Sequence, residues 1–269
     1  MGTKKPLFWR LVGSLYDLDK VIKMQKKFDA CTLKIIAIIG MSLQHTSEAF
    51  GNSLTDWLHI PLQISGGLTF PILAFLLTEG YRHTSNLPRY MIRLLIFGIV
   101  SQLPFMWALS SNNVNIMFTL LAGLIALYLY DWLKKRWFFW IFFVFIVIGT
   151  VRFDWSGIGV IMVLLFHIGN MKNPKHIVFP IVIVGCILGL VYFMSFGSII
   201  RNLPPGSEIS VLPYIASMLF PVGIFATIPL IKGYNGEKGR SIKYFFYVFY
   251  PLHLLILALI VNYPTFIFG

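Results

Sequence analysis

The chain has 269 residues, of which 57% are hydrophobic and only 12% are charged, and its formal net charge is +12. Soluble domains carry about 25% charged residues, so this composition excludes a water-soluble globular protein. Two cysteines are too few to indicate a disulfide framework or a metal site. In a membrane protein, basic residues in the connecting segments account for the positive charge, and we expect no nucleic-acid partner.

Residues 1–30 are predicted to form a basic segment at the membrane surface. Apolar residues recur at helical spacing between Phe8 and Ile22, and lysines gather between Lys20 and Lys27. An amphipathic helix of this kind binds the anionic lipids of the inner leaflet. The alternative is a helix that docks onto a partner protein.

Residues 31–269 are predicted to form an all-α, polytopic membrane domain with about nine transmembrane helices, because roughly 20 mostly apolar residues cross a bilayer. The fifth and sixth predicted spans are short, and the sequence RFDWSG between them also fits a broken or re-entrant pair. The predicted spans are residues 32–50, 58–79, 90–109, 114–133, 136–151, 155–170, 176–196, 210–231 and 242–263.

Basic residues alternate between the two sets of connecting segments. The segments before span one and after spans two, four, six and eight hold clustered lysines and arginines, whereas the other set holds only Arg152 and Arg201. Cytoplasmic loops carry the excess of positive charge in membrane proteins. We therefore predict a multi-pass protein of the cytoplasmic membrane, with its N-terminus in the cytoplasm and its C-terminus outside.

The first predicted span, TLKIIAIIGMSLQHTSEAF, carries three ionisable residues on one helical face. With 100° per residue, His45 lies about 20° and Glu48 about −40° from Lys34, and His45 is roughly 16 Å along the axis. Ionisable groups inside a bilayer commonly serve function, and histidine exchanges a proton near neutral pH. The alternative is that Lys34 reaches lipid head groups and that His45 bonds a neighbouring helix.

Four segments resemble the TraX family, in the same order along residues 32–262: LKIIAIIGMSLQH, FPILAFLLTEGYRHTSN, MFTLLAGLIALYLYDW and FYVFYPLHLLIL. The TraX family is associated with N-terminal acetylation of conjugative pilin and is similar to the wider acyltransferase-3 group. In that group a basic residue and a catalytic histidine have the spacing of Lys34 and His45. The TraX pattern has Asp before this histidine, where this chain has Gln44, so Glu48 is the candidate replacement.

The resemblance implies a site for acetyl-CoA at the cytoplasmic end of the second predicted span. Glu79 and Arg82 are one turn apart and can pair. Arg82, Arg89 and Arg93 carry guanidinium groups, which suit the phosphates of coenzyme A. The alternative for these arginines is anchoring in the inner leaflet.

Four further residues are candidates for binding the acceptor. Asn115 can bond an oxyanion or a sugar, or else cap a helix. Asp154 can supply the carboxylate that Gln44 lacks, or else pair with Arg152 or cap the sixth predicted span. Tyr250 and His253 flank Pro251 about one turn apart, as a second polar wall or as a helix–helix contact.

These residues favour a membrane acyltransferase that moves an acetyl group from acetyl-CoA to an amine or hydroxyl of an exported peptide or glycan. His45 is then the general base. One alternative is a transporter or flippase, for which the polar stripe acts as a proton relay. The other is a non-catalytic assembly protein, which Gln44 favours.

Overall fold

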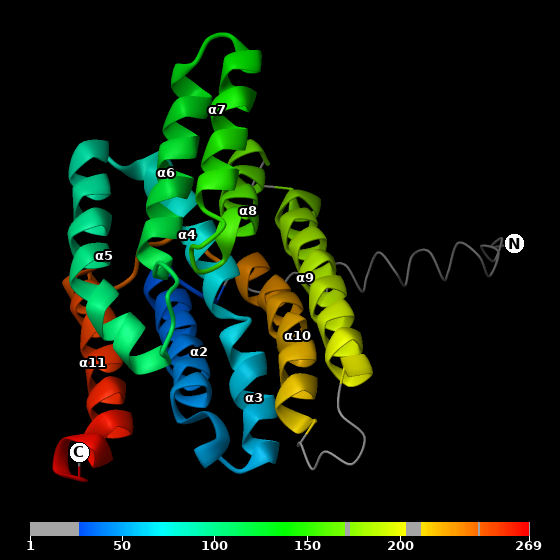
Figure 1. Cartoon of the computed structure of the whole chain (residues 1–269). Coiled ribbons are helices and arrows are strands. Elements are labelled where there is room, and N and C mark those ends of the chain that lie inside the picture. Colours follow the sequence, from blue (N-terminus) through cyan, green and yellow to red (C-terminus); the bar gives the residue numbers. More distant parts are fainter. Residues whose placement is uncertain (1–26, 170–172, 203–210, 242, 269) are drawn as a thin grey trace, which may run out of the picture.

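The computed structural model describes residues 27–169, 173–202, 211–241 and 243–268, and in them every element longer than an isolated bridge is a helix (Figure 1). The amphipathic helix predicted before residue 27 lies outside these ranges. The elements are α2 (Ala30–Phe50), η1 (Gly51–Ser53), α3 (Asp56–Gly66), α4 (Thr69–His83), α5 (Leu87–Leu109), α6 (Ile116–Trp132), α7 (Arg136–Gly149), α8 (Ser156–Ile168), α9 (Pro174–Asn202), α10 (Leu212–Lys232) and α11 (Lys243–Phe268).

Short polar side chains set the starts of three helices. The carboxylate of Asp29 accepts the backbone N–H of Thr32 at 2.7 Å, and this bond lowers the pKa of Asp29 below its ordinary value. Asn86 accepts the N–H of Arg89 in the same way, and Asn115 begins α6. Each cap satisfies a backbone donor that the helix itself leaves unpaired.

The multi-pass helical architecture is confirmed, whereas the predicted number of nine spans is not. Among the described residues, five helical segments are long and apolar enough to cross a membrane: Trp57–His83, Leu87–Leu109, Pro174–Asn202, Leu212–Lys232 and Tyr244–Asn262. α6, α7 and α8 are apolar but shorter. α2 has 21 residues but is not among the five, since its ionisable side chains reduce its mean hydropathy.

The second predicted span is two helices, because the chain turns at Gly66 and Gly67 between α3 and α4. α3 then packs backbone to backbone on α10. A Cβ atom on Gly223 would lie 1.8 Å from the carbonyl oxygen of Ile64, and one on Gly67 would lie 2.4 Å from that of Phe220. Small residues allow this approach, which is a principal source of helix association in membranes.

The fifth and sixth predicted spans form a short hairpin, α7 and α8, of 14 and 13 residues. Each is about 20 Å long, less than the roughly 30 Å of a bilayer core. The loop between them bonds the segment before α6: Val114 N–H donates to the Arg152 carbonyl at 2.9 Å, and Asp154 N–H donates to the Val114 carbonyl at 2.7 Å. The residues of the fifth and sixth predicted spans are thus helical but shorter than a full crossing.

The residues that enter α2 are bonded to the loop between α10 and α11. The N–H groups of Lys27 and Phe28 donate to the carbonyl of Gly233 at 2.9 and 3.1 Å, and Asn235 N–H donates back to the carbonyl of Phe28 at 2.9 Å. We call this pairing the strap. It fixes the start of α2 beside the end of α10.

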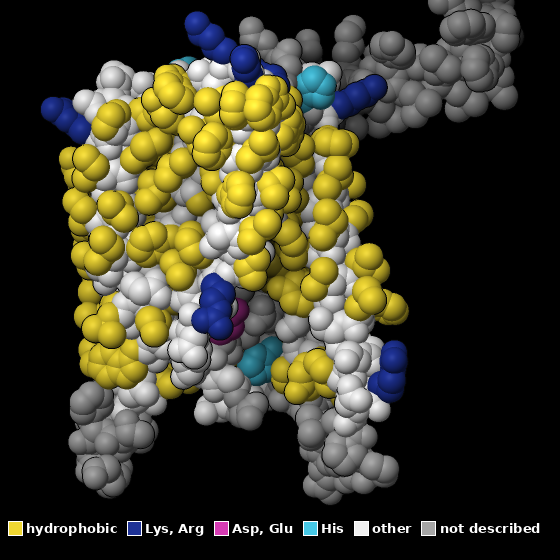
Figure 2. Space-filling model, turned by 45° about the horizontal axis from the view of Figure 1, so that its top comes forward, with side chains coloured by type: hydrophobic (Ala, Val, Ile, Leu, Met, Phe, Trp, Pro, Cys, Tyr) yellow, Lys and Arg dark blue, Asp and Glu magenta, His cyan; other side chains and the backbone are white. Residues whose placement is uncertain are grey.

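The outer surface is apolar over most of the face in Figure 2, with Lys and Arg side chains along one rim. Lower on this face, side chains of all three ionisable kinds gather around a hollow. Large exposed apolar residues on α5, α7, α9 and α11 supply such surface elsewhere, among them Leu103, Phe145 and Phe193. A surface of this composition is suited to lipid.

The close contact of α3 and α10 makes Gly223 intolerant of any side chain. Gly223→Ala is expected to lower the free energy of unfolding by about 1–3 kcal/mol, because overpacking forces the helices apart. The measurement is thermal unfolding in neutral detergent. Gly197→Ala in α9 is the control, since a Cβ there meets nothing within 4 Å, and equal melting temperatures for the two variants would contradict the prediction.

Candidate functional site

A pair of buried histidines joins α2 to α11. His45 Nδ1 and His253 Nε2 are 2.9 Å apart, and the two rings are nearly coplanar, with an interplanar angle of 3°. Only 5% of His45 and 8% of His253 are exposed. The hydrogen-bond partner of His45 is therefore a residue 208 positions away, where sequence reasoning had offered Glu48.

Hydrogen bonding fixes which nitrogens carry protons in the neutral pair. His253 Nδ1 lies 3.0 Å from the carbonyl oxygen of Phe249, and a carbonyl can only accept, so Nδ1 donates. His253 Nε2 is then an acceptor, and His45 Nδ1 donates to it. The Phe249 ring also stacks on His253, with centroids 5.1 Å apart, so α11 holds His253 on two sides.

Tyr250 completes the cluster around the pair. Its ring centroid lies 6.4 Å from that of His45 and 5.6 Å from that of His253. Tyr250 is 1% exposed, and its hydroxyl has no hydrogen-bond partner in the described part of the chain. We call His45, His253 and Tyr250 the central cluster.

Glu48 lies outside the central cluster. Its carboxylate accepts from Gln44 Nε2 at 2.9 Å, so Gln44 and Glu48 satisfy each other along one side of α2. Gln44 also packs on the turn between α3 and α4, where a Cβ on Gly66 would meet it.

Lys34 and Arg93 line a cavity of about 470 Å³ enclosed by α2, α4, α5, α6 and α11. Lys34 Nζ lies 5.5 Å from the centre of the Phe246 ring, and the Arg93 guanidinium lies 5.6 Å from that of Tyr90. Such cation–π contacts hold the charged groups against the wall. Tyr250 also lines this cavity, which therefore reaches the central cluster.

Arg82 is occupied by the protein backbone. Its Nη2 donates to the carbonyls of Phe166, His167 and Gly169 at 3.0 to 3.3 Å, which caps the end of α8. Its Nη1 is 3.1 Å from Glu79 Oε1. Arg89 is exposed at the start of α5, so of the three predicted phosphate-binding arginines only Arg93 lines the cavity.

Asn115 and Asp154 hold the backbone together near the starts of α6 and α8. The fully buried Asn115 amide donates to the Gly98 carbonyl at 2.7 Å and to Gln102 Oε1 at 2.9 Å, while its oxygen accepts the N–H of Met117. The hydroxyl of Thr119 donates to the backbone carbonyl of Asp154. Asn115 thus caps α6 and bonds a neighbouring helix, the alternative that the sequence allowed. Asp154 is held here through its backbone, and the role of its side chain stays a prediction.

Two further polar contacts in the structure involve residues that were not among the predicted site residues. Ser47 Oγ and His59 Nδ1 are 2.7 Å apart in buried surroundings between α2 and α3. Between α4, α6 and α8, the Asp131 carboxylate accepts from the Tyr81 hydroxyl at 2.8 Å and from His167 Nε2 at 3.0 Å. In each case the partners come from different helices, so no local spacing in the sequence indicated them.

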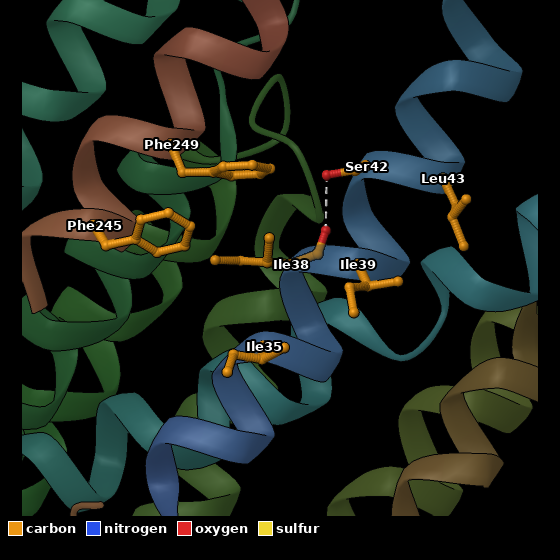
Figure 3. A pocket seen from close by; sticks show the side chains of 7 residues that line it. All are labelled: Ile35, Ile38, Ile39, Ser42, Leu43, Phe245 and Phe249. Atoms are coloured by element: carbon orange, nitrogen blue, oxygen red, sulfur yellow. Dashed lines mark hydrogen bonds between the residues drawn. The ribbon is translucent and has the colours of Figure 1, made fainter. Parts of the chain in front are cut away.

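An apolar groove of about 580 Å³ runs along the outside of α2 and α11 (Figure 3). Phe245 and Phe249 of α11 face Ile38 of α2, and the Ser42 hydroxyl is turned back onto the Ile38 carbonyl at 2.9 Å. Phe249, whose ring stacks on His253 of the central cluster, also lines this groove. Its lining residues are Ile35, Ile38, Ile39, Ser42, Leu43, Phe245 and Phe249.

Comparisons with known proteins give a family match and a similar fimbrial protein. Residues 30–261 match the family described as TraX protein. The chain is similar to the probable fimbrial assembly protein FimC, serogroup H1, of Dichelobacter nodosus, with 29% identity over 253 residues that cover 86% of this chain and 95% of the relative. No solved structure matches significantly.

These findings correct the prediction of an acyltransferase. The relative is described as a probable fimbrial assembly protein, which contradicts the predicted acyltransferase, and the assembly alternative fits better. The comparisons give no similarity to the acyltransferase-3 group, and the acetyl-CoA site stays a prediction without the activity that motivated it. Because the family match covers most of the chain, this protein belongs to the TraX family.

Proposed function

We propose that this chain is a non-catalytic membrane protein that assists the assembly of a pilus- or fimbria-like fibre. The observation that carries the proposal is the similarity to a fimbrial assembly protein, which extends over 86% of this chain and 95% of the relative. Similarity along nearly the whole of both chains favours a shared overall role over a shared fragment.

The geometry of the central cluster supports a structural role for the histidines. Both histidines use their ring nitrogens for contacts within the protein. His45 Nδ1 contacts His253 Nε2, and His253 Nδ1 contacts the Phe249 carbonyl. A buried polar pair of this kind specifies how α2 and α11 meet, since neither ring finds another partner in lipid. The helical body then presents the α2–α11 groove on its outside as a fixed surface.

Loss of the chain is expected to abolish surface fibres while the fibre subunit is still made. The test is deletion of the coding sequence in the organism that encodes it, followed by electron microscopy of the cell surface and immunoblotting of the subunit in membranes. Restoring the wild-type chain is the control and should restore the fibres. Unchanged fibre numbers in the deletion strain would contradict the assembly role.

The histidine pair is expected to behave as a structural link. His45→Leu leaves His253 Nε2 buried without a donor and should lower the free energy of unfolding by about 1–3 kcal/mol, whereas His45→Leu with His253→Leu removes both partners and recovers much of that loss. Fibre number should follow the amount of folded protein in both variants. A double variant that is stably folded but forms no fibres would refute the structural role.

The orientation is proposed as the loop charges predict, with the N-terminus in the cytoplasm. In a chain with Cys31→Ala and Cys186→Ala, Lys135→Cys at the start of α7 should resist a membrane-impermeant maleimide in intact cells. Asn112→Cys, between α5 and α6, should react. Both positions are exposed, and both should react after the cells are lysed. The reverse pattern in intact cells would invert the proposed topology.

A further inference from the structure

The cavity that contains Lys34 and Arg93 has the size of a ligand site. Its volume of about 470 Å³ lies within the roughly 300–1,000 Å³ of small-molecule pockets. Residues Tyr234, Gly236 and Lys238 of the loop that forms the strap line one end, and Tyr250 lines it near the central cluster. The cavity therefore extends from the basic end of the helices into their interior.

One end of this cavity is cationic. Lys34, Arg93 and Lys238 all line it. The acidic residue there, Glu79, is already paired with Arg82 at 3.1 Å. Arg93 Nε is buried and has no hydrogen-bond partner among the described residues. A buried donor without a partner costs stability, and an anionic oxygen is its natural partner, because guanidinium geometry suits phosphate.

The remainder of the cavity is lined mainly by apolar side chains. Leu73, Leu76 and Leu77 of α4 line it together with Leu94 of α5 and Leu120 of α6. Leu76, Leu77, Leu94 and Leu120 are buried, and Leu73 is partly buried against them, so these side chains belong to the core. Walls of this kind favour a hydrocarbon tail over an ion or a sugar.

We propose that this cavity binds a phosphate ester with a single apolar tail. The phosphate lies among Lys34, Arg93 and Lys238, and the tail lies among the leucines toward Tyr250. The two possible sources of this chemistry are a single-chain phospholipid of the membrane and a soluble phosphorylated compound. The proposal is independent of the assembly role, because it depends only on the cavity.

The test is native mass spectrometry of the full chain released from neutral detergent and titrated with dodecyl phosphate. The wild type is expected to bind one equivalent saturably. Arg93→Gln and Lys34→Gln should each weaken binding about tenfold, the loss of one charge-assisted contact. Lys175→Gln, which removes an exposed charge at the start of α9 outside the cavity, should bind as the wild type does.

Two further measurements distinguish a phospholipid from a soluble phosphorylated compound and control for misfolding. Competition by inorganic pyrophosphate indicates a soluble ligand, whereas binding that requires the tail indicates a lipid, and either result supports the shared chemistry. Arg93→Lys keeps the charge and should retain more affinity than Arg93→Gln, with melting temperatures recorded for every variant. Equal affinity in the wild type, Arg93→Gln and Lys34→Gln, or no saturable binding to the wild type, would overturn the proposal.

Discussion

The structure depends on the need to satisfy polar groups where no water is present to do so. Inside a bilayer an unpaired polar group costs several kcal/mol, and this chain places histidine, asparagine, serine and threonine in its interior. Each finds a partner across helices or on its own backbone, and the longest-range of these pairings is the contact of His45 with His253. The strap holds the start of α2 at the end of α10, and the histidine pair joins α2 to α11, although these helices lie at opposite ends of the sequence.

Composition and periodicity predicted the helical, multi-pass character of the chain and the polar face of α2. They did not predict the turn between α3 and α4. Gly66 and Gly67 are a turn signal, but apolar runs long enough to read as one span continue on both sides of them. The shortness of α7 and α8 was visible in the sequence RFDWSG. Its cause, the bonding of that loop to Val114, is a tertiary contact that the sequence does not reveal.

The candidate site shows the same division. His45 and His253 were both identifiable, since ionisable residues in apolar helices are rare, but their pairing was not, because residues 208 positions apart share no helical register. Arg82 was predicted to bind phosphate because of its charge and its guanidinium geometry. The structure directs it instead to three carbonyls at the end of α8. Local spacing predicts which residues share a face, whereas the neighbour on that face is decided by how the helices pack.

The turn at Gly66 and Gly67 divides one membrane-crossing segment into two helices, α3 and α4, whose main packing partners differ. α3 packs mainly on α10, which in turn packs on α9, whereas α4 packs mainly on α8 and also contacts α6 and α10; α2 contacts both halves. Because the α-helical ladder is already interrupted at the turn, α3 can tilt relative to α4 without breaking a helical hydrogen bond. The segment is thus two helices joined by a turn at which it can bend. Amide hydrogens of α3 and α10 can therefore exchange with solvent as one cooperative unit while those of α4, α6 and α8 stay protected.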